Sequence, residues 1–260
     1  MAAGGIIGGL VLDGGKVSDI RQVTAAIIVL GGTLGAVMVT SPLTSLIRAA
    51  KGLKNVFFEE VIDLDAAVDE IVGFASKARK SSIISLEEDL DKIGDPFLKK
   101  ALSLAIDGTD LKELHKMMDL EIFQAEKREE TAVKVYESAG GYSPTIGIIG
   151  AVMGLIQVMK HLENIDEVGR GIAIAFVATV YGVAVANLFF LPVANKLKAR
   201  IHNDVQVKEL LLEGVGSIIE GMNPKLIRLK LEAFVEPGGK KKVSAGTETA
   251  GNRQPAAAKG

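Results

Sequence analysis

The segment YSPTIGIIGAVMGLIQVM, residues 142–159, indicates the fold class of this chain. It has no charged side chain, and its length approaches the roughly 20 apolar residues that a membrane-spanning helix needs. It also contains Pro144, Gly147, Gly150 and Gly154, although a glycine in a water-exposed helix costs about 1 kcal/mol relative to alanine. In lipid, small residues let helix backbones approach closely. The segment is therefore predicted to be a membrane helix that neighbouring helices hold tightly.

The composition requires apolar and charged residues to be separated along the chain. Of the 260 residues, 48% are hydrophobic and 24% are charged, and the mean hydropathy is +0.31. This composition is too apolar for an ordinary soluble domain and too rich in charged residues for a pure membrane bundle. A net charge of −2 provides no basic excess for nucleic acid. The absence of cysteine excludes disulfides and thiolate metal sites.

Three long uncharged runs and one short run predict four transmembrane helices. The long runs are residues 22–47, 138–159 and 171–195, and each reaches the length of a membrane span. Residues 1–12 are too few for a full span and lack the basic region of a signal peptide. We expect them to be the end of a first span that is short or that begins upstream.

Lysine and arginine near the span ends predict the orientation, because positive flanks favour the cytoplasmic side. Such residues follow the second span, precede the third and follow the fourth. They are Arg48, Lys51, Lys54, Lys127, Arg128, Lys134, Lys196, Lys198 and Arg200. This places both termini and the large region between spans two and three in the cytoplasm.

Five regions are predicted from these runs. Residues 1–47 form spans one and two, residues 48–137 a helical cytoplasmic domain, and residues 138–195 spans three and four. Residues 196–237 form a C-terminal cytoplasmic helix, and residues 238–260 form a disordered tail because they are small, polar and basic.

The cytoplasmic domain is predicted to be helical. Apolar residues recur at helical spacing from Val61 to Phe74. Asp95 followed by Pro96 predicts the start of a further helix that ends at Gly108, and Asp110 can cap a long helix that runs into the third span. No strand pattern competes, so the expected class is an all-α polytopic membrane protein.

Catalytic chemistry is scarce in this sequence. The histidines His115, His161 and His202 are scattered, and no phosphate-binding loop is present, so we expect no enzyme, cofactor or metal site. The long spans also lack the ionisable group that a transporter usually keeps at membrane depth. If an ion crosses here, its carboxylate must come from another chain.

The fourth span contains polar and small residues in a pattern. Ala178, Gly182 and Ala186 repeat every four residues, which predicts a flat packing stripe. The hydroxyl of Thr179 either faces a water-filled path or bonds to its own helix backbone.

Two prolines lie near the inner ends of the third and fourth spans. Pro144 and Pro192 each remove one backbone hydrogen bond. Two kinks at matching depth predict a hinge layer between membrane and cytoplasm, and simple helix termination is the alternative.

Four separated blocks resemble the MotA family of flagellar stator proteins. They are IIVLGGTLGAVMVTSP, ARKSSIISLEEDLDKIGDPFLKKALSLAIDGTD, SPTIGIIGAVMGLIQVM and GIAIAFVATVYGVAVANLFFLPVANKLK. The resemblance covers about residues 23–220. It implies a stator subunit that forms, with a MotB-type partner, an ion channel that converts ion-motive force into torque. It also implies five copies around two partner chains, an ion-binding Asp supplied by the partner, and a glycine-rich third span packed on a partner's helix.

The resemblance assigns roles to seven residues. Thr179 matches the channel-facing threonine, and Pro144 and Pro192 match the paired prolines. Ala151 occupies the third-span position where sodium-using members carry a threonine, so the implied coupling ion is the proton. The residues that match the contact with the rotor switch protein are Arg79, Lys80 and Glu87. On one continuous helix, Lys80 and Glu87 would share a face.

Other interpretations remain open from the sequence. The three charged residues could form an ordinary solvated helix face. An ExbB- or TolQ-type subunit would share the ion-driven ring but would energise outer-membrane processes, and it would have three spans. An unrelated four-span scaffold would conduct nothing.

Overall fold

The computed structural model of the chain describes residues 2–57 and 64–235. Within these ranges all regular structure is helical, as the all-α prediction requires. The predicted tail, residues 238–260, and Val61 of the predicted apolar stripe lie outside the described residues.

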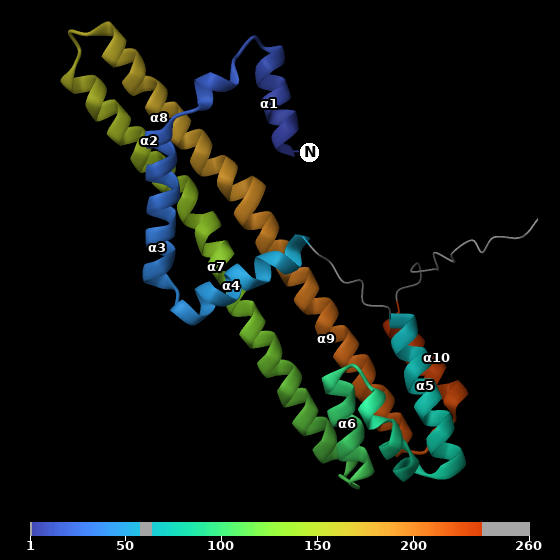
Figure 1. Cartoon of the computed structure of the whole chain (residues 1–260). Helices are drawn as coiled ribbons and strands as arrows, with labels where there is room; N and C mark the ends of the chain where they lie inside the picture. The colour runs from blue at the N-terminus through green and yellow to red at the C-terminus, as the bar shows by residue number, and fades with distance from the viewer. Residues whose placement is uncertain (1, 58–63, 236–260) are drawn as a thin grey trace, which may run out of the picture.

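Two long antiparallel rods form the body of the molecule (Figure 1). The first is α7 (Leu111–Lys160), whose 50 residues span about 75 Å at the rise of an α-helix. The second is made of α8 (Ile165–Val185), the π-turn η4 (Ala186–Phe190) and α9 (Leu191–Ile219). The predicted third and fourth spans are thus the apolar parts of helices that continue into the charged domain.

A third apolar helix packs against this pair. It consists of α2 (Val23–Ala26), the π-turn η2 (Ile27–Gly31) and α3 (Gly32–Thr40). By length and composition, this helix and the two rods are able to cross a membrane. The predicted second span, residues 22–47, needs a correction, because the helix ends at Thr40. Ser41 has an extended backbone, the conformation that the following proline favours.

The remainder of that run belongs to α4 (Leu43–Phe57), which lies across the two rods (Figure 1). Tyr136 of α7 donates a hydrogen bond from its hydroxyl to Ala49 O at 2.9 Å, in a buried position. Arg48 Nη1 donates to Arg128 O of α7 at 2.9 Å. These contacts hold α4 at the boundary between the apolar spans and the charged domain.

The N-terminal run forms α1 (Ala2–Leu12), which is linked to α2 through η1 (Val17–Ile20). Its 11 residues are fewer than the roughly 20 that cross a bilayer. Leu12 is 91% exposed, and α1 stands apart from the two rods (Figure 1). The first transmembrane helix therefore remains an expectation.

The charged end of the molecule is a small helical domain packed on the ends of α7 and α9. It contains α5 (Leu64–Ser81), the 3-10 segment η3 (Ile83–Lys92), α6 (Pro96–Ile106), α10 (Pro224–Leu231) and η5 (Glu232–Phe234). Its fully buried side chains include Ile71, Leu98, Leu102, Leu114, Met118, Leu210, Val215, Ile227 and Leu231.

The predicted helix boundaries in this domain are confirmed. Asp95 accepts a hydrogen bond from Leu98 N at 2.8 Å, and Pro96 is the first helical residue of α6. Gly108 ends the helix region with φ at 79°, a conformation that glycine adopts without strain. Asp110 caps α7 through its side chain.

Candidate functional site

The backbones of α7 and α8 meet at a seam of small residues. A Cβ atom added at Gly147 would lie 2.8 Å from Ala178 O, and one at Gly182 would lie 2.6 Å from Ser143 O. Gly154 faces the backbone of α8 at a similar distance. Even one methyl group has no room here, so glycine is needed for the two helices to pack.

The seam shows what the glycine stripe of α7 contacts within the chain. Gly147 and Gly154 pack against α8 of the same chain, and contact of the third span with a partner's helix stays a prediction. The short turn between the helices brings the stripe opposite Ala178 and Gly182, and Ala186 lies one turn further along the second rod. Those three residues are buried, which confirms the flat packing stripe predicted for the fourth span.

Thr179 and Ala151 lie beside this seam. Thr179 is half-buried next to Gly147, and its Oγ1 donates to Ala175 O at 3.2 Å, so its hydroxyl bonds to its own helix. Ala151, also half-buried, is one helical turn from Gly147 on the same side of α7. Across the described ranges, no three His, Cys, Asp or Glu side chains gather where they could hold a metal ion.

The two prolines lie near the charged end of the seam, at different depths. Pro144 is beside Gly182, and α7 continues through it without interruption. Pro192 follows the π-turn η4, and the preceding residue, Leu191, packs against Gly140. Gly182, which lies beside Pro144, is ten residues before Pro192 along the second rod, so the two prolines are offset by about 15 Å and do not lie at the matching depth that the sequence predicted.

Two π-turns and one buried hydroxyl could not be predicted from the sequence. The π-turns η2 and η4 interrupt the second and fourth spans, and such turns often mark functional positions. Just after η2, Thr33 is 1% exposed, and its Oγ1 has no hydrogen-bond partner among the described residues. A buried hydroxyl normally has a partner, so this atom marks a buried polar point on α3 among apolar helices.

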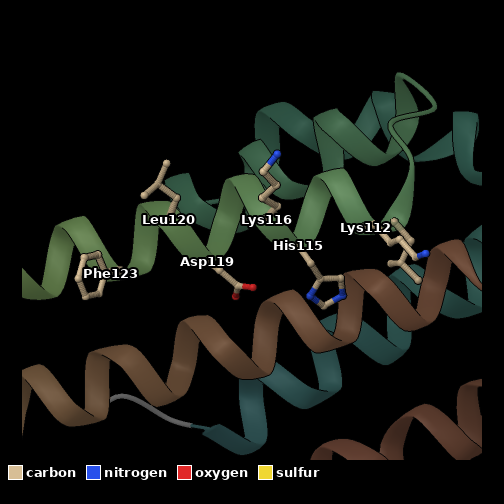
Figure 2. A pocket seen from close by; sticks show the side chains of 7 residues that line it. Lys112, His115, Lys116, Asp119, Leu120 and Phe123 are labelled. Atoms are coloured by element: carbon tan, nitrogen blue, oxygen red, sulfur yellow. The ribbon is translucent and has the colours of Figure 1, made fainter.

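A broad surface hollow of about 830 Å³ lies along the charged half of α7 (Figure 2). Figure 2 shows His115 and Asp119 pointing from α7 towards α9. His115 packs on Gly216, where a Cβ would lie 2.9 Å from its Nε2. Further along α7, the exposed side chains of Leu120 and Phe123 present apolar surface. One histidine and one carboxylate line this hollow.

The predicted rotor-facing residues lie at a sharp turn in the charged domain. Arg79 and Lys80 are exposed at the end of α5, and Glu87 is exposed in η3. The helix breaks at Ser82, whose φ is 77° and ψ is 156°. The expectation that Lys80 and Glu87 share one helix face is therefore wrong. The break turns the chain back so that Leu86 can be fully buried in the core.

Ion pairs within this turn occupy most of its other charged groups. Asp89 Oδ2 lies 2.5 Å from Lys77 Nζ, and Asp89 Oδ1 lies 2.9 Å from Lys92 Nζ. Hydrogen bonds from Lys77 and Lys92 lower the pKa of Asp89, so its carboxylate stays ionised to a lower pH than that of an ordinary aspartate. Asp91 pairs with Lys99 at 2.9 Å.

We call the exposed residues without such partners the free charges of the turn. In the part of the chain that the structure describes, they form no ion pair. They are Arg79, Lys80 and Glu87. They are the same three residues to which the family resemblance assigned the rotor contact.

Comparisons with known proteins agree with this arrangement. Residues 89–210 match the MotA/TolQ/ExbB proton channel family, and residues 1–81 match the motility protein A N-terminal family. The second match separates the chain from ExbB and TolQ. The chain belongs to the MotA family of flagellar stator proteins.

Relatives of this MotA-family chain cover most of its length. Motility protein A of Bacillus subtilis is 35% identical over 229 residues, which are 87% of this chain and 84% of that protein. The structure of C. jejuni MotAB matches with a TM-score of 0.88 and 30% identity over 94% of this chain and 95% of that chain. The flagellar MotAB stator complex of B. subtilis matches with a TM-score of 0.81 and 34% identity over 88% and 90% of the two chains. The chain is thus a multi-pass membrane protein, and the ExbB- or TolQ-type alternative is not favoured.

Proposed function

We propose that this chain assembles with a MotB-type partner into a flagellar stator that converts ion flow into torque on the rotor. The observation that carries the proposal is the match to MotAB over 94% of the chain with a TM-score of 0.88. The family resemblance adds five copies of this chain around two partner chains. No bond is made or broken in this function, so we propose no enzymatic reaction.

The apolar surface of the spans supports an assembly. In the apolar windows of the three long helices, only 22%, 28% and 33% of the residues are buried within the chain. Large apolar side chains on the outer side of α7 remain about half exposed, among them Ile148, Ile149, Val152 and Met153. Lipid, neighbouring copies and the partner's helix must cover this surface.

In this proposal the partner provides the ionisable carboxylate that is absent from the seam between α7 and α8. The described spans contain hydroxyls but no ionisable group at the seam, so the ion-binding Asp comes from the partner in this proposal. Thr179 and Ala151 then lie along the ion path. Pro144 and Pro192 flank its inner end, where the offset between them would let the two rods bend at successive levels.

The coupling ion is the proton in this proposal. Sodium binding needs several oxygen ligands close together, and Ala151 has no side-chain oxygen. The hydroxyl of Thr179 already donates to Ala175 O. A lone hydroxyl beside the partner's Asp suits a protonatable carboxyl better than a sodium cage.

We expect cells that depend on this chain and its partner to swim at unchanged speed in sodium-free medium when the proton gradient is intact. A protonophore should stop them even when sodium is supplied. Tethered-cell rotation measures both effects, and cells without the partner are the control. Rotation that stops without sodium and survives the protonophore would show that sodium is the coupling ion.

The charged domain faces the cytoplasm of an inner-membrane protein in this proposal. The chain has no cysteine, so single cysteines report accessibility cleanly. We expect Glu163→Cys, in the exposed turn between α7 and α8, to react with an impermeant thiol reagent in intact cells. The exposed Ser81→Cys should react only after the membrane is permeabilised. Labelling of Ser81→Cys in intact cells would reverse the orientation.

The free charges of the turn form the rotor contact in this proposal. Their neighbours are engaged in pairs within the domain, whereas Arg79, Lys80 and Glu87 are exposed and can pair with groups on another protein. Charge complementarity of this kind gives a contact its orientation and its association rate more than its raw affinity. A contact that is made and released repeatedly needs these properties.

A further inference from the structure

We propose that Asp89 is a positioning residue that fastens η3 to α5 and so holds Glu87 at a set place relative to Arg79 and Lys80. This inference rests on the proposed rotor contact. It adds a role for residues that do not themselves touch the rotor. Asp89 and its two lysine partners are called the latch below.

The latch joins two elements through one carboxylate. Lys77 lies on α5, before the break, and Asp89 and Lys92 lie on η3, after it. Both oxygens of Asp89 are used, one by each lysine, at 2.5 and 2.9 Å. The pair between Lys77 and Asp89 is the bond of the latch that crosses the break.

The pair between Lys77 and Asp89 is more shielded than the other ion pairs nearby. The side chain of Asp89 is 21% exposed and that of Lys77 is 34% exposed, whereas Asp91 is 97% exposed in its pair with Lys99. An attraction between charges is stronger where water screens it less, and fully exposed pairs contribute little. Loss of the Asp89 pair should therefore matter, and loss of the Asp91 pair should not.

The turn needs contacts that hold it in place, because its backbone is strained at Ser82. Ser82 has a backbone conformation that is nearly confined to glycine, and such strain persists only where the surrounding structure holds it in place. Ser85 donates from its backbone N and its Oγ to Ser82 O, at 3.1 and 2.7 Å. These local bonds do not reach α5. Within the described residues, the segment after the break is held by the fully buried Leu86, by the partly buried Ile83 and Leu90, by the latch, and by a longer pair between Lys77 and Glu88 at 3.9 Å. Glu87 lies between Leu86 and Asp89.

A spin label on η3 tests the latch directly. Ile84 is 63% exposed, so Ile84→Cys provides the labelling site in the cysteine-free chain, purified with its partner. We expect Asp89→Asn to increase the mobility of the label at least twofold and to reduce swimming speed at least twofold. Lys77→Gln, which breaks the same pair from the α5 side, should do the same. Asp89→Glu should restore both readouts in part.

The matched control is Asp91→Asn, which neutralises a carboxylate two residues away and should change neither readout. Equal label mobility in Asp89→Asn and Asp91→Asn would overturn the latch, whatever happens to swimming. A mobile label with normal swimming in Asp89→Asn would overturn the positioning role. In that case Arg79→Glu, which leaves the latch intact, separates the two proposals. Impaired swimming of Arg79→Glu would support the proposed rotor contact, whereas normal swimming would contradict that proposal as well.

Discussion

Gly182→Ala is expected to destabilise the protein by about 1–3 kcal/mol and to abolish or strongly reduce motility, because the added methyl overpacks the seam. Its Cβ would lie 2.6 Å from Ser143 O, 3.1 Å from Gly147 Cα and 3.2 Å from Pro144 Cα. All three atoms belong to the backbone of α7, so no side-chain rotation can relieve the clash. The two rods would have to separate, and the residues along the ion path would separate with them.

Gly141→Ala is the matched control, because the same change is made in α7 at a position with nothing within 4 Å of the new Cβ. Alanine is a better helix former than glycine by about 0.5–1 kcal/mol, so this variant should be neutral or more stable. Thermal unfolding of the detergent-purified protein and swimming assays measure both variants. Equal unfolding temperatures for Gly182→Ala and Gly141→Ala would show that the seam between α7 and α8 accommodates the added methyl group without loss of stability.

Arg79→Glu is expected to lower swimming strongly while membrane insertion and assembly with the partner stay normal. Arg79 is exposed and has no ion pair among the described residues, so its reversal should change stability by no more than about 0.5 kcal/mol. A reversed charge on the stator surface would meet a like charge on the rotor, and a compensating reversal on the rotor should restore part of the motility. Swimming speed and the amount of assembled complex in membranes are the two measurements.

Lys225→Glu provides the control for charge reversal, because Lys225 is also exposed but lies on α10, away from the turn. Cells that carry Lys225→Glu should swim normally. Normal swimming of Arg79→Glu, of Glu87→Lys and of the double variant would remove this surface as the rotor contact.

Local signals in the sequence were sufficient for the helices and most of their boundaries. Asp95 with Pro96, Gly108 and Asp110 act through hydrogen bonds and backbone preferences within a few residues of the chain. The long apolar runs predicted helices able to cross a membrane, because hydropathy depends on composition alone. The motif around Arg79 and Glu87 and the glycine pattern of the third span were enough to indicate the family.

What these elements contact was decided by the tertiary structure. The glycines of α7 could have met any small-residue helix, and only the fold brings them onto Gly182 and Ala178 of the same chain. The unpaired buried hydroxyl of Thr33 likewise depends on the π-turn before it and on the helices around it.

The charged turn shows the same division between sequence and structure. Helical spacing predicted that Lys80 and Glu87 share one face. In the folded chain the helix breaks at Ser82, and Leu86 after the break is buried in the core. The sequence contains Lys77 and Asp89 without indicating that they pair, because they lie 12 residues apart on opposite sides of that break. An amino-acid sequence determines which charges are present, whereas only the folded chain determines which of them neutralise each other and which remain free for a partner.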